Sequence, residues 1–159
     1  MKITIIGVGK IKEAYFRDAV AEYSKRLSKY CKFQIIEVAD EECPENASAA
    51  EEEQIKDREG EKILKRIPNG AYVIALAIDG KKVDSVDFSK EMQRIFLSGK
   101  NVICFVIGGS IGLSKNVLSA ADMKLSFSDM TFPHQLMRVI LSEQIYRAFR
   151  IMNHEPYHK

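Results

Sequence analysis

NVICFVIGGSIGLS, residues 101–114, joins an apolar run to a cluster of glycines. The run 101–107 is apolar on both faces, as expected of a central strand in a parallel sheet. Three glycines in five residues follow at 108, 109 and 112, and Ser114 can cap a helix after them. The glycine loop is either a tight turn into that helix or a place where backbone approaches a ligand, and both interpretations stay open from this stretch alone.

Strand and helix patterns alternate on both sides of this stretch. Apolar residues recur at three- and four-residue steps in the predicted helices, whereas the predicted strands are short β-branched or apolar runs. We expect an α/β sheet with helices on both faces, in a single domain over 1–159 without a linker or repeat. The predicted strands are 2–8, 32–38, 71–78, 101–107 and 124–127; the predicted helices are 16–30, 47–67, one ending at Leu97, a short one from Ser114, and 133–152.

Short polar signals predict where several elements end. Pro68-Asn69-Gly70 ends the helix 47–67, and Asp79-Gly80 is expected to turn the chain after the third strand. Asp87 or Ser85 is the expected cap of the next helix, and Gly99 stands where a residue of positive φ is wanted after it.

A first glycine cluster, Gly7-Val8-Gly9-Lys10-Ile11-Lys12, begins like the dinucleotide fingerprint GxGxxG. Lys12 stands where the third glycine is needed, so close packing of helix on strand over a pyrophosphate is not supported. We interpret this cluster as a turn that ends a strand.

A third segment, FSDMTFPHQL at 127–136, leads from the last short strand into the long final helix. It places Ser128, Asp129 and Thr131 between the rings of Phe127 and Phe132. Apolar walls with a few polar groups suit an adenine-like ligand. In α/β sheets ligands bind at the carboxyl ends of strands, so three such loops qualify together: those beginning at Leu76, at Gly108 and at Phe127.

Composition excludes several classes. Hydrophobic residues are 46% and charged residues 29%, with a net charge of +2 and a pI near 8.4, the balance of an ordinary globular protein. Cys31, Cys43 and Cys104 form no CxxC pair, which disfavours a zinc site or a disulfide framework and fits a reducing compartment. The longest apolar runs, 71–78 and 102–107, are far below the roughly 18–20 residues of a membrane span. We expect a cytoplasmic protein without a membrane segment.

The final helix is apolar on more than one side. One stripe is widened by Leu136, Val139 and Tyr146 beyond the usual arc. Either the helix is deeply buried within one chain or it also packs at a subunit interface, and the second interpretation is favoured.

The chain ends in NHEPYHK, 153–159, which contains two of its three histidines. His154 and His158 have the i, i+4 spacing of helical metal ligands, but Pro156 lies between them and no cysteine or acidic cluster joins them. No metal is expected. Pro156 is expected to end the helix and turn Tyr157 and His158 off its axis.

FVIGGSIGLS, then LSFSDMTFPHQLMRVILSEQIYRA, then a terminal PYHK together resemble the bacterial large-subunit ribosomal RNA methyltransferase H family, over the full chain. Members of that family are pseudouridine N3-methyltransferases of the SPOUT class. The resemblance implies a C-terminal trefoil knot, a homodimer and the cofactor S-adenosylmethionine. Carried over by motif position, the cofactor contacts would be Leu76, Gly108, Phe127, Ser128, Asp129, Met130, Thr131 and Phe132.

The implied substrate is a pseudouridine in the helix 69 loop of 23S rRNA, within the assembled ribosome. Local basic residues such as Arg147, Arg150 and Lys159 would hold the RNA. An enzyme of the same class acting on tRNA and a non-catalytic ribosome-binding factor are the alternatives.

Four residues are the candidates for catalysis. Arg138 and His134 lie four residues apart, on one side of the final helix, and Arg138 is expected to hold a substrate phosphate or uracil oxygen. His134 either takes part or only closes its loop. Tyr157 and His158 are candidates for substrate contact and proton acceptance, delivered within one chain or across the dimer.

Overall fold

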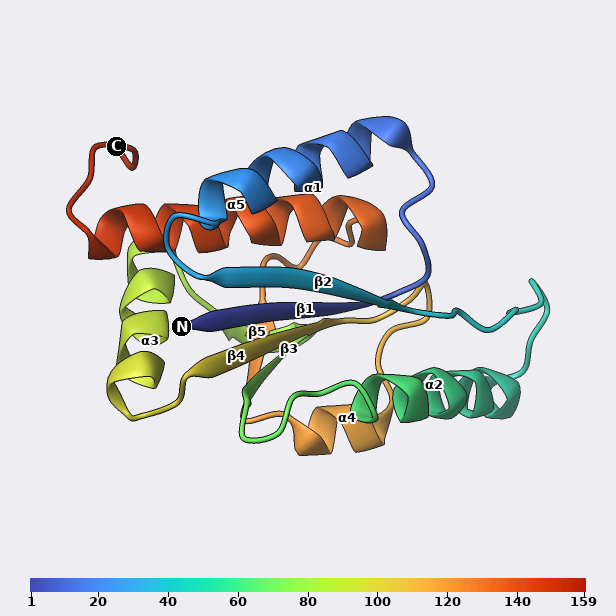
Figure 1. Ribbon diagram of the computed structural model, residues 1–159. Helices are drawn as coiled ribbons and strands as arrows, with labels where there is room; N and C mark the ends of the chain where they lie inside the picture. The colour runs from blue at the N-terminus through green and yellow to red at the C-terminus, as the bar shows by residue number, and fades with distance from the viewer.

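A five-stranded parallel sheet forms the centre of the molecule (Figure 1). The computed structural model describes residues 1–159, and its strand order is β2-β1-β4-β3-β5. The predicted α/β class is confirmed. The strands are β1 (Lys2–Val8), β2 (Lys32–Val38), β3 (Tyr72–Lys82), β4 (Val102–Ile107) and β5 (Met123–Ser126); the helices are α1 (Ala14–Leu27), α2 (Ala49–Leu64), α3 (Ser85–Leu97), α4 (Lys115–Ala120) and α5 (His134–Met152).

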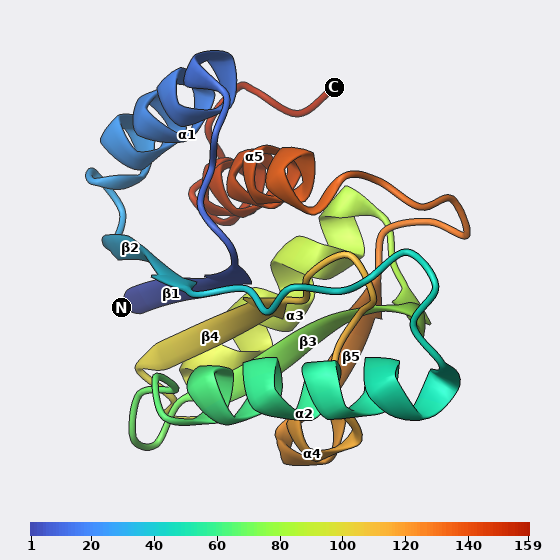
Figure 2. The same ribbon diagram turned by 90° about the vertical axis from the view of Figure 1, so that its right-hand side faces the viewer.

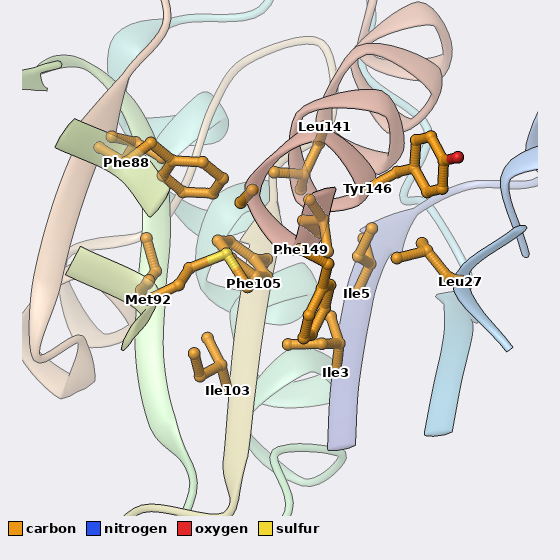
Figure 3. Close-up of a cluster of buried hydrophobic side chains, with 14 of the residues drawn as sticks. Ile3, Ile5, Leu27, Phe88, Met92, Ile103, Phe105, Leu141, Tyr146 and Phe149 are labelled. Atoms are coloured by element: carbon orange, nitrogen blue, oxygen red, sulfur yellow. The ribbon is translucent and has the colours of Figure 1, made fainter. Parts of the chain in front are cut away.

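Helices cover both faces of the sheet. α1, α3 and α5 lie on one face, and α2 and α4 lie on the other (Figure 1). The larger core lies under α5, where Ile3, Ile5 and Phe105 of the sheet meet Leu141 and Phe149 of the helix (Figure 3). A smaller core lies between the sheet and α2 with α4.

The prediction of a central strand apolar on both faces, made from residues 101–107, is confirmed by β4. Ile103 and Phe105 face the larger core, whereas Cys104 and Val106 face the smaller one, and all four are fully buried. β4 pairs with β1 on one side and β3 on the other, as a doubly apolar central strand should.

The breadth of the apolar surface of α5 is explained within one chain. α1 and α3 flank this helix while the sheet lies beneath it, and no residue from His134 to Met152 is exposed. Tyr146 is buried, and Leu136 and Val139 are half-buried. Burial against the sheet and the two flanking helices of the same chain therefore accounts for the wide apolar surface, without the subunit interface that the sequence favoured.

Two local predictions were wrong at the end of β3. Asp79-Gly80 does not turn the chain: β3 continues to Lys82, and its register with β5 shifts between Leu76 and Lys81. Gly80 permits this close approach, because a Cβ there would lie 2.7 Å from the carbonyl carbon of Leu125. The cap of α3 is Asp84, whose side chain accepts a hydrogen bond from the N–H of Asp87, and Ser85 is the first helical residue.

The final helix ends at its own C-terminal motif and not at Pro156. His154 adopts φ 54°, its N–H donates to Ile151, and the N–H of Glu155 donates to Arg150. This is the Schellman pattern, with histidine in the position that glycine usually occupies. His154 is therefore explained by helix termination.

No helix of the protein combines the length and the apolar character that a bilayer crossing requires. No group of three or more His, Cys, Asp or Glu side chains is placed to hold a metal ion. The trefoil knot stays a prediction.

Candidate functional site

A cavity of about 370 Å³ lies at the carboxyl edge of the sheet, where the loops after β3, β4 and β5 converge. Figure 2 shows this edge, with the loops that leave β1, β4 and β5 toward the viewer. The three loops singled out in the sequence thus meet around one space. The candidate cofactor residues that line it are Leu76, Gly108, Phe127, Ser128, Met130, Thr131 and Phe132.

Asp129 is the candidate cofactor residue that does not line the cavity. Its carboxylate pairs with Lys82 at 2.5 Å, and both side chains are largely exposed. The backbone of this loop can border the cavity while the Asp129 side chain points to solvent, so the segment matters more than this carboxylate.

Several residues that line the cavity were not among the site residues expected from the sequence. Ile78 comes from β3, at the last residue of the expected strand 71–78, and Met137 comes from the first turn of α5. Ser110 and Ile111 line the cavity from within the glycine loop. The signal for the last two was present, because 107–114 had been identified as one loop.

The glycine loop is both a tight turn and a wall of the cavity. Gly109 and Gly112 form an isolated antiparallel bridge, and the N–H of Gly112 donates to the carbonyl of Gly109 at 3.2 Å. Gly112 adopts φ +90°, and a Cβ on Gly108 would lie 2.8 Å from the carbonyl carbon of Gly112. Ser114 then caps α4 through the N–H of Val117. Glycine is required here by backbone packed against backbone.

The opposite wall is held by local hydrogen bonds within its own loop. Ser126 Oγ donates to the carbonyl of Ser128 at 3.2 Å, and the N–H of Met130 donates to Ser128 Oγ at 3.0 Å. These bonds fix the loop that carries Phe127 and Phe132. Apolar side chains and backbone polar groups therefore form the walls, and the volume lies within the range typical of small-molecule sites.

Arg138 lies inside the protein and away from solvent. Its side chain is fully buried, and its guanidinium donates to Glu37 Oε2 and to the carbonyls of Val8 and Gly9, each at 2.8 Å. Burial lowers the pKa of the guanidinium, and the Glu37 carboxylate acts in the opposite direction. Gly7 leaves the room for this group, because a Cβ there would lie 2.5 Å from Arg138 Nε.

Arg138 in this position has a structural role. Its guanidinium ties the carboxyl ends of β1 and β2 to the first turn of α5. The expected contact with a substrate oxygen is not available to a side chain that is 0% exposed.

His134 lines the cavity at the start of α5. Partial burial lowers the pKa of its imidazole, and the positive charge of Arg138 lowers it further. The neutral imidazole is therefore favoured over the imidazolium beside the cavity.

Tyr157 and His158 pack on the middle of α5. Tyr157 Oη donates to Glu143 at 3.1 Å, and its ring meets Tyr146 edge-on with centroids 5.0 Å apart. Arg147 lies over the Tyr157 ring at 4.7 Å and contacts His158 Nδ1 at 3.2 Å. Burial and the neighbouring Glu143 carboxylate raise the pKa of the Tyr157 phenol.

The C-terminal tail, residues 156–159, and the cavity of the same chain are well separated. Met137 is the last residue of α5 that lines the cavity, and Glu143 lies six residues further on, about 9 Å along the helix axis. Of the four catalytic candidates, the structure brings only His134 to the cavity.

Comparison with known proteins defines the class. A family model described as "Predicted SPOUT methyltransferase" matches residues 1–158, so the chain belongs to the SPOUT methyltransferase family. A solved structure of a probable methylase family protein from Haemophilus influenzae Rd KW20 shares the fold. Its TM-score is 0.51 at 12% sequence identity, over 96% of this chain and 66% of that one.

Curated relatives narrow the assignment. The protein of Clostridium botulinum (strain Hall) is 60% identical and that of Clostridioides difficile (strain 630) is 59% identical, each over 159 residues and 100% of both chains. Both are named Ribosomal RNA large subunit methyltransferase H. At this identity over the full length, the chain is a member of the ribosomal RNA large subunit methyltransferase H family.

Proposed function

We propose that this protein transfers a methyl group from S-adenosylmethionine to N3 of a pseudouridine in the helix 69 loop of 23S rRNA. The ribosomal RNA named for its relatives at 59–60% identity is the observation that carries the proposal. The assembled ribosome in the cytoplasm is the substrate, as the resemblance of the glycine loop, the 127–136 segment and the PYHK ending implies.

The cavity fits the cofactor. Adenine needs flat apolar walls, which Leu76 and Phe127 offer, and backbone polar groups, which the loop at Gly108 supplies. The remaining proposed contacts come from the 128–132 loop, whose backbone is held by Ser126 and Ser128. When bound, S-adenosylmethionine supplies an activated methyl on a sulfonium; the protein supplies position and exclusion of water.

The N3 atom of pseudouridine carries a proton that must leave during transfer. Tyr157 is a poor acceptor, because its raised pKa keeps the phenol protonated at neutral pH. The imidazole of His158 is the stronger candidate, and His134 beside the cavity is the other. Arg138 acts by positioning the start of α5 and contacts no substrate atom.

We infer that the protein works as a homodimer in which the tail of one chain serves the cavity of its partner. The distance between tail and cavity within one chain supports this inference. Exposed apolar side chains beside the cavity, Ile78 and Met130, also favour a partner there.

The test is mass spectrometry of 23S rRNA from a strain lacking this gene, with purified protein added back to its ribosomes. We expect one methyl to be missing from the helix 69 pseudouridine and to return with the protein and S-adenosylmethionine. An unchanged spectrum in the deletion strain would overturn the proposal. A methyl missing from tRNA instead would support the tRNA alternative, and cofactor binding that calorimetry fails to detect would support a non-catalytic ribosome-binding factor.

A truncation separates the two halves of the site. Protein lacking residues 156–159 should bind S-adenosylmethionine like the full chain and transfer no methyl to ribosomes. Mixed dimers that combine a truncated chain with a chain carrying Gly108→Ala should recover part of the activity if the tail acts across the dimer. No recovery would favour action within one chain.

A further inference from the structure

We propose that the loop between β1 and α1 binds the RNA backbone through Lys10 and Lys12, beside the cavity. This inference rests on the proposed function and adds a place for the substrate's phosphates. It concerns the cluster Gly7–Lys12, which lacks the third glycine of a dinucleotide site.

The loop is held rigidly by three different elements. Arg17 of α1 donates to the carbonyls of Ile11 and Lys12, at 3.2 and 2.6 Å. The N–H of Ile11 donates to Glu37 Oε2 at 2.8 Å, and the N–H of Lys12 donates to Gln135 Oε1 at 3.0 Å. Because side chains satisfy these main-chain groups, the loop has one defined course before any ligand arrives.

The same hydrogen bonds place the loop beside the start of α5, whose first residue lines the cavity. Gln135 follows His134, which lines the cavity, and Glu37 also accepts from Arg138 beneath the start of α5. A nucleic-acid strand that brings a base to the cavity can also reach this loop, since both lie at the carboxyl edge of the sheet (Figure 2).

The charges of Lys10 and Lys12 are free for a partner. Both residues are exposed, and neither forms an ion pair with a carboxylate. By contrast, two of the basic residues expected from the sequence to hold RNA are engaged: Arg147 pairs with Glu143 at 2.6 Å, and Arg150 pairs with Glu155 at 2.9 Å.

Neighbouring carboxylates limit the positive potential of the loop and so the strength of its contact with RNA. Glu13 and Asp40 are exposed near the loop and reduce its positive potential. The contact therefore involves one or two phosphates and not a long basic track. An acidic protein surface would be repelled by these carboxylates as much as it was attracted, whereas single phosphates can approach each ammonium separately.

The experiment compares two double variants of the full-length protein. Lys10→Ala/Lys12→Ala removes the loop charges, and Lys32→Ala/Lys100→Ala removes two exposed lysines that form no ion pair, from the amino edge of the sheet. The probe is ribosomes from a strain lacking this gene. Methyl transfer is followed at several salt concentrations, and S-adenosylmethionine binding is measured by calorimetry.

We expect the loop variant to raise the KM for ribosomes roughly tenfold and to reduce the slope of log(kcat/KM) against log salt by about 1–2. kcat and cofactor affinity should stay at the wild-type level, and Lys10→Arg/Lys12→Arg should restore KM. The amino-edge variant should behave like wild type.

Three results would overturn the inference: an unchanged KM and slope in the loop variant, an equal effect in the amino-edge variant, or a raised KM with an unchanged slope. In each of these the wild-type protein still methylates ribosomes, so the proposed function stands. Wild-type protein that transfers no methyl to ribosomes would remove the proposed function, and the inference with it.

Discussion

The two glycine clusters of this chain follow neighbouring strands, β1 and β4, and use their missing side chains differently. At Gly7 the absent Cβ leaves room for the buried guanidinium of Arg138, which arrives from α5. At Gly108 it lets the backbone of Gly112 fold back and form the wall of a cavity. A glycine-rich motif therefore indicates a close approach, and only the three-dimensional structure shows whether the approaching group belongs to the chain or to a ligand.

Gly7→Ala should give the largest change in stability. The added Cβ would lie 2.5 Å from Arg138 Nε, so the guanidinium would have to leave a site where it makes three hydrogen bonds. We expect the free energy of unfolding to fall by about 3 kcal/mol in urea titrations. Gly70→Ala is the control: its surroundings are open and only its φ of +73° is strained, so about 1 kcal/mol is expected. Equal losses in the two variants would contradict the account of Gly7.

Gly108→Ala should act on the cavity more than on stability. Its Cβ would meet the Gly112 carbonyl carbon at 2.8 Å and oxygen at 3.0 Å, which displaces one wall of the cavity. We expect at least a roughly tenfold loss of S-adenosylmethionine affinity by calorimetry, with a loss of about 1–2 kcal/mol in unfolding free energy. Wild-type affinity in a folded variant would show that this loop only turns the chain.

His154→Gly tests the converse case, a position that calls for glycine and has none. His154 has φ 54° at the end of α5, a conformation that costs an L-residue about 1 kcal/mol. The variant should gain about that much stability, which for a chain of this length raises Tm by roughly 2–4 °C in calorimetric scans. His154→Ala retains the strain and should gain nothing; a gain as large as that of glycine would locate the effect in the imidazole.

The smallest expected effect on stability concerns His134, which lines the cavity together with the second glycine cluster. Its folded-state pKa is lowered, so the unfolded chain binds the proton more readily. Stability is unaffected above the unfolded pKa of about 6.5 and falls as pH drops below it. His134→Gln should show a smaller loss of unfolding free energy between pH 7.5 and 5.5 than wild type. An identical loss would mean that the imidazole titrates alike in both states.

The sequence predicted those features that depend on neighbouring residues. The doubly apolar strand 102–107, the glycine loop and the cap at Ser114 are local, and the structure confirms all three. The convergence of three loops followed from the parallel sheet, because its strands all end at one edge. Local reasoning failed at Asp79-Gly80, where pairing with β5 overrides a turn signal.

Other features depend on partners that are far apart in the chain. Arg138 had the residue type and position of a substrate contact, and only the approach of Val8, 130 residues away, shows that it is internal. Likewise, the i, i+4 spacing of His154 and His158 says nothing about the left-handed conformation of His154, which follows the end of the helix at Met152.

The position of β1 in the sheet has a consequence for the order of folding. β1 precedes the other strands in the chain, yet it lies between β2 and β4. One edge of β1 therefore stays uncovered until β4, which begins at Val102, has been synthesised. The cavity needs a still later part of the chain, up to Met137. A nascent chain therefore exposes one edge of its first strand through most of translation, and such long-range parallel pairing is intrinsically slow. Competence to hold a small ligand arrives only after Met137 has been synthesised.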